Sequence, residues 1–199
     1  PETNYLNNVK IHMSFIDLKI GRINDFESKK SLIELKHLNN EEKYNYYRLM
    51  AYYHEIFNDN YNINENYIKS LEYAETKEQR FYIYNKLLKL SELIGSPNLS
   101  VEYIEKIQDN IQQFDKDLFY KWIKYKHELG HHNDVSNKLQ SLLDDAKTLK
   151  DKLFYQIGIA HSDIYLQNYG FGEQRLDDLI EKNASSTVLK NEFSEIYYL

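Results

Sequence analysis

The pentapeptide HELGH occupies residues 127–131 and matches the pattern His-Glu-x-x-His. On a continuous α-helix, residues four apart lie on one face, so His127 and His131 could bind one Zn²⁺ ion through their imidazoles. Glu128 could then activate a zinc-bound water for hydrolysis. This chemistry needs a helix that continues past His131 and a third protein ligand for the metal.

The residues around this pentapeptide favour a different interpretation. Gly130 is typical of a helix end, so His131 would begin a loop and would not lie one turn above His127. A third ligand could be proposed only from Asp134, Asp144, Asp145 and His161. We therefore expect no catalytic residue, no metal and no cofactor, and we keep a zinc metallopeptidase as the less favoured alternative.

Composition limits the class of protein. The chain has 199 residues, six Gly, two Pro, no Cys and a net charge of −6. The absence of Cys excludes disulfides and fits a cytoplasmic location. The acidic charge argues against broad nucleic-acid binding, and no apolar run approaches the roughly 20 residues of a membrane span. Because the chain starts at Pro1 and stops on EIYYL, we expect a fragment of a longer protein.

Helical patterns fill most of the chain. Apolar residues recur every three or four positions in four long segments, 43–57, 80–94, 117–129 and 151–166. Shorter amphipathic segments follow at 64–75, 99–111, 134–149 and 172–182. No alternating apolar and polar run predicts a strand, so we expect an all-α fold.

Signals at the helix ends agree with this division. Thr76 with Gln79 forms a capping box, Pro97 follows the cap residue Ser96, and Asp115 precedes the third long helix. Gly95 and Gly130 follow helices as stop signals. The connections are therefore predicted to be short.

The long helices also resemble one another. Each carries an aromatic residue followed by Tyr, at Tyr46-Tyr47, Phe81-Tyr82, Phe119-Tyr120 and Phe154-Tyr155. The first residues of these pairs are separated by 81 − 46 = 35, 119 − 81 = 38 and 154 − 119 = 35 positions. A period of about 35 residues with two helices per unit indicates stacked helical hairpins.

Residues 41–183 resemble the tetratricopeptide repeat family. Phe119, Gly130 and Val135 match its first-helix aromatic, its turn and its second-helix small position, and Phe154 and Gly158 match in the next unit. Met50, Asn85 and Ile123 depart from its small-residue position. The resemblance implies antiparallel helical hairpins stacked as a right-handed solenoid, in a single domain over residues 1–199.

Such repeats bind peptides or protein segments in a concave groove, and the register of the aromatic pairs predicts its lining. The peptide-binding residues predicted from this register are Tyr47, Tyr82, Lys86, Lys89, Tyr120, Lys124, His127 and Tyr155. Phenol hydroxyls and ammonium groups suit an extended peptide that carries a carboxylate. The alternative is that the Tyr side chains are half-buried between helices and the Lys side chains lie along the surface.

The Tyr- and Asn-rich repeats also resemble the peptide-sensing regulators of Gram-positive bacteria and their phages, of the Rap and PlcR type. This resemblance implies the ligand-sensing domain of a regulator, with roles in transcription regulation and quorum sensing. Because such regulators often bind their peptides through Asn side chains of the helices, the resemblance also makes Asn85 a predicted peptide-binding residue. It also implies an upstream effector or DNA-binding module, whereas this fragment itself would not contact nucleic acid. The competing expectation is a general protein-interaction scaffold, and a homodimer is an open alternative for its assembly.

Overall fold

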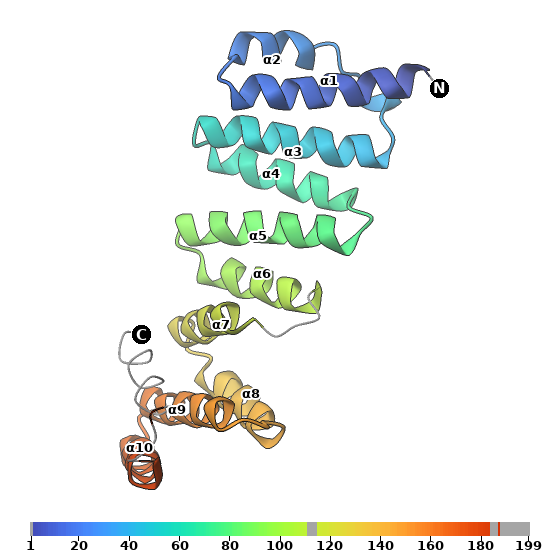
Figure 1. Ribbon diagram of the computed structural model, residues 1–199. Helices are drawn as coiled ribbons and strands as arrows, with labels where there is room; N and C mark the ends of the chain where they lie inside the picture. Colours follow the sequence, from blue (N-terminus) through green and yellow to red (C-terminus); the bar gives the residue numbers. More distant parts are fainter. Residues whose placement is uncertain (1, 111–114, 184–186, 188–199) are drawn as a thin grey trace. The chain divides into compact units, whose positions relative to one another are not determined.

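The computed structural model describes residues 2–110, 115–183 and 187 (Figure 1). These residues form ten α-helices, one short 3₁₀ helix and no strand, which confirms the predicted all-α class. None of the described helices is both long and apolar enough to cross a membrane. The sequence predicts one domain over residues 1–199; in the structure the chain divides into two compact units, unit 1 (residues 1–114) and unit 2 (residues 115–199).

Unit 1 is built from three helical hairpins. Its elements are α1 (Glu2–Lys19), α2 (Ile23–Lys30), η1 (Leu35–His37), α3 (Asn40–Ile56), α4 (Asn60–Glu72), α5 (Lys77–Leu93) and α6 (Pro97–Asn110). The pairs α1/α2, α3/α4 and α5/α6 pack side by side, as Figure 1 shows. Contacts of α1 with α3 and of α4 with α5 join each hairpin to the next.

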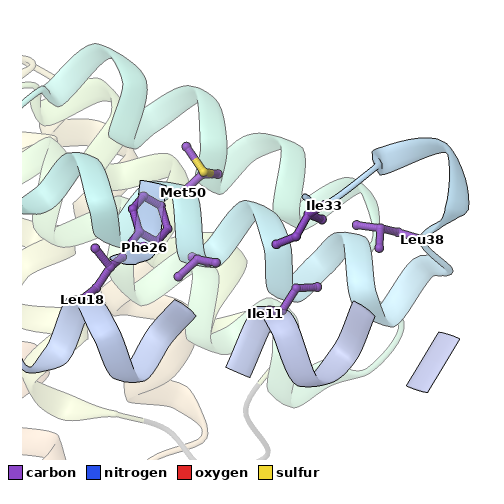
Figure 2. Packing of buried hydrophobic residues seen from close by; sticks show 7 residues of the cluster. Ile11, Leu18, Phe26, Ile33, Leu38 and Met50 are labelled. Atoms are coloured by element: carbon purple, nitrogen blue, oxygen red, sulfur yellow. The ribbon is translucent and has the colours of Figure 1, made fainter. Parts of the chain in front are cut away.

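The first hairpin lies outside the predicted repeats and packs onto α3. Figure 2 shows the shared core. Its buried members are Ile11, Leu18, Phe26, Ile33, Leu38, Leu49 and Met50. The ring of Phe26 stacks on that of Tyr53 with centroids 4.8 Å apart. Met50, which departs from the repeat pattern, is therefore a core residue of this junction.

The predicted capping box of unit 1 and the predicted glycine stop at Gly95 are present. The Thr76 hydroxyl accepts a hydrogen bond from the Gln79 amide, and the Gln79 side chain accepts one from the Thr76 amide, which completes the capping box. Gly95 adopts a φ of +66°, the left-handed conformation that favours glycine, before Pro97 begins α6.

The described residues of unit 2 form four helices: α7 (Lys116–Glu128), α8 (His132–Asp144), α9 (Leu149–Tyr165) and α10 (Tyr169–Asn183). The side chain of Asp115 accepts a hydrogen bond from the Leu118 amide and caps α7, as predicted. Helix α9 packs against both α8 and α10. Gly158 permits the first of these contacts, because a Cβ atom there would lie 2.7 Å from the Leu139 Cδ1 atom.

Candidate functional site

The HELGH pentapeptide spans a helix end. Helix α7 ends at Glu128, Gly130 adopts a φ of +77°, and α8 begins at His132. The amide of His131 donates to the Lys126 carbonyl in the turn. His127 and His131 therefore do not share a helix, which confirms the turn predicted from Gly130. In the part of the chain that the structure describes, no group of three or more His, Asp or Glu side chains is arranged to hold a metal ion.

The turn brings His127 next to His132 instead. Their Nδ1 atoms lie 2.8 Å apart, so one imidazole donates a hydrogen bond and the other accepts it. The ring of Tyr165, at the end of α9, stacks on both imidazoles, with centroid distances of 4.4 Å to His127 and 5.1 Å to His132. Side chains of three helices, α7, α8 and α9, thus combine in a packed cluster of three rings.

A cavity of about 200 Å³ lies beside this cluster. Its lining comes from one face of α7 and one face of α9, where residues three or four apart point the same way. The residues of α7 are Tyr120, Ile123, Lys124, His127 and Glu128, and those of α9 are Phe154, Gly158, His161 and Tyr165. The walls are thus mostly aromatic, and Lys124 and Glu128 are exposed.

The two imidazoles of the lining are held in the neutral form. Burial, followed by the proximity of His132 and His161, lowers the pKa of His127 to about 4. Burial also lowers the pKa of His161 below its ordinary value. At neutral pH the cavity therefore offers uncharged hydrogen-bonding nitrogens among aromatic rings.

Three of the four predicted site residues in unit 2 line this cavity. Tyr120 packs edge-on against Phe154 with centroids 4.6 Å apart, and Lys124 and His127 follow on the same face of α7. Tyr155 is the exception, because it is buried and packs beside Phe154 outside the lining. Burial raises the pKa of the Tyr155 phenol, which is a packing residue here.

Two predicted site residues of unit 1, Tyr47 and Tyr82, contact other side chains of the same unit. Tyr47 is half-buried and stacks on Tyr73 with centroids 5.8 Å apart. The guanidinium carbon of Arg48 lies 4.3 Å from the ring centroid of the exposed Tyr82. Asn85 donates its side-chain amide to the Phe81 carbonyl of its own helix, and Lys89 is exposed.

Lys86 is part of an internal network in unit 1. Its Nζ atom lies 3.0 Å and 3.2 Å from the two carboxylate oxygens of Glu55 on α3. Tyr67 of α4 donates its hydroxyl to the same carboxylate at 2.7 Å. Burial, with the bond to Glu55, raises the pKa of Tyr67 far above its ordinary value. The charge of Lys86 is thus neutralised within the unit, which weakens the predicted role of Lys86 as a carboxylate receptor.

The residues of α9 that line the cavity were not predicted as site residues. Phe154, Gly158, His161 and Tyr165 are spaced by four, three and four positions. That spacing places them on one helical face, and it is the sequence signal from which these four residues could have been predicted. The pairing of His127 with His132 has no comparable signal, because it depends on the geometry of the turn.

Comparison with known proteins assigns no family to this chain, since no family model, no curated protein and no solved structure matches it.

Proposed function

We propose that this chain is a helical-repeat module that binds a short peptide or a protein segment, and that the cavity of unit 2 receives one side chain of that ligand. The observation that carries the proposal is the cavity itself, which is lined by aromatic side chains and bordered by the exposed Lys124 and Glu128. Concave, mostly apolar sites with a few polar groups are the usual form of a ligand-binding pocket.

The two exposed charges suit the main chain of a peptide. Lys124 can bond to a carbonyl or a carboxylate, and Glu128 can accept from an amide or an ammonium group. An anchored side chain flanked by such contacts fixes both the position and the direction of an extended ligand. This arrangement is why a peptide is preferred to an isolated small molecule.

Within this class, we propose a sensor domain of a bacterial or phage regulator, with hairpins stacked as a right-handed tetratricopeptide-like solenoid. The support for this narrower proposal is the sequence resemblance over residues 41–183. It connects the module with transcription regulation and quorum sensing through a peptide signal.

A general interaction scaffold is the second candidate, and the outer face of α1 favours it. Three apolar side chains on this face, Leu6, Met13 and Ile16, are 46–58 % exposed, and Ile20, which follows α1 directly, is 55 % exposed. Their spacing of seven, three and four residues forms a stripe along one side of the helix. A partner helix could cover this stripe with no use of the cavity.

Selection of heptapeptides on the immobilised full chain tests the proposal. A selected peptide should bind the wild-type chain in titration calorimetry and lose at least tenfold in affinity when Ile123→Trp fills the cavity. Ile180→Trp is the matched control, because this isoleucine is exposed on α10 and does not line the cavity. Equal affinity of the wild type and Ile123→Trp, with a loss for Ile16→Lys on α1, would favour the scaffold.

A further inference from the structure

The imidazole of His127 has one nitrogen with a partner and one without. Its Nδ1 atom is bonded to His132, whereas its Nε2 atom is buried and has no hydrogen-bond partner among the described residues. A buried polar atom without a partner lowers stability, so a ligand that supplies the missing bond gains affinity.

The tautomer of His127 decides which bond is missing. If its Nδ1 donates to His132, its Nε2 is an acceptor; if its Nδ1 accepts, its Nε2 carries a proton and is a donor. A ligand carbonyl or carboxylate can satisfy only the second state, and an ammonium group only the first. A hydroxyl group both donates and accepts, so it satisfies either state.

The size and walls of the cavity select an aromatic ring. An apolar cavity of about 150 Å³ can hold one benzene molecule, so a volume of about 200 Å³ is large enough for a substituted ring. Tyr120, Phe154 and Tyr165 provide ring faces and edges for offset or edge-to-face contact. The neutral imidazoles impose no requirement for a charged ligand.

We propose that the cavity binds one hydroxyl-bearing aromatic ring, as in a tyrosine side chain of the ligand, with the hydroxyl bonded to the Nε2 atom of His127. This inference rests on the proposed function, because it specifies which side chain the pocket receives.

The matched pair p-cresol and toluene tests the inference, because the two molecules differ only by the hydroxyl group. Both are titrated into the ¹⁵N-labelled full chain and followed by NMR. p-Cresol should bind about tenfold more tightly than toluene, the effect expected of one hydrogen bond to a buried group. The ¹⁵N resonance of the His127 Nε2 atom should shift with p-cresol and not with toluene.

A pair of histidine variants serves as the control. His127→Phe should bring the two affinities within about twofold of each other, since it removes the nitrogen and keeps a ring. His131→Phe should retain the preference for p-cresol, because His131 lies outside the cavity lining.

Equal binding of both probes to the wild type, or p-cresol binding with no change at His127 Nε2, would overturn the inference. If the selected heptapeptide still loses affinity in Ile123→Trp, the anchor pocket stands and only the hydroxyl recognition fails. If Ile123→Trp does not weaken heptapeptide binding while the wild type still prefers p-cresol, the proposed function is rejected instead.

Discussion

Replacing Tyr67 with phenylalanine should destabilise unit 1 by about 1.5 kcal/mol. The Tyr67 side chain is 1 % exposed, and its hydroxyl donates to the Glu55 carboxylate at 2.7 Å. Hydrogen bonds to charged groups contribute about 1.5–3 kcal/mol. The lower end applies because the Glu55 side chain is 28 % exposed and keeps its ion pair with Lys86, so water can replace the lost donor. The ring stays in place, so no cavity forms.

Urea denaturation followed by circular dichroism measures this change in the free energy of unfolding. Tyr61→Phe is the matched control on the same helix, because Tyr61 is 73 % exposed and its hydroxyl is in water. The control should stay within about 0.5 kcal/mol of wild type. A change below about 0.5 kcal/mol for Tyr67→Phe would refute the argument that this network stabilises the α3/α4 hairpin.

Three further predictions concern stability. Folding lowers the pKa of His127 from 6.5 to about 4, so the unfolded chain takes up the proton at a higher pH than the folded chain. The free energy of unfolding should therefore fall as the pH drops from about 6.5 to 4. In urea denaturation, His127→Gln should flatten this dependence on pH. Gly130→Ala should destabilise the fold by about 1–2 kcal/mol, because Gly130 has a φ of +77°. Gly170→Ala should not destabilise the fold, because Gly170 lies in helix α10 with open space around it. Thermal melts compare the two variants. Phe26→Ala should cost about 3–5 kcal/mol in the same melts, because the ring is fully buried in the core of the first hairpin; a loss below 1 kcal/mol would contradict that role.

Local signals made most helix boundaries predictable. The capping box at Thr76, the cap at Asp115 and the glycines at positions 95 and 130 depend on residues within a few positions of each other, and each has the predicted conformation. The turn at Gly130 also decided against a single helix through HELGH.

The sequence pattern did not predict the first hairpin, because polar residues lie on the buried face of α1 and apolar residues on its exposed face. Polar side chains, Asn7, Ser14 and Asp17, are buried beside Ile11 and Leu18. Apolar side chains occupy the opposite, exposed face at Leu6, Met13, Ile16 and Ile20. Because apolar residues occupy both faces of this helix, its sequence does not show one apolar face opposite a polar one, which is the pattern that predicts a packed helix.

Only some of the predicted site residues lie together in the structure. The register of α7 correctly placed Tyr120, Lys124 and His127 on one face, which lines the cavity. The ion pair between Lys86 and Glu55 joins residues 31 positions apart, and no local pattern shows that this charge is already neutralised.

Isoleucine methyl NMR on the full chain with a selected heptapeptide tests the anchor pocket most directly. Ile123 lines the cavity, whereas Ile16 on α1 and Ile20, which follows α1 directly, are exposed. We expect intermolecular nuclear Overhauser effects between the peptide and the Ile123 methyl groups, with none to Ile16 or Ile20. Contacts of the bound peptide with Ile16 or Ile20 and none with Ile123 would contradict the anchor pocket.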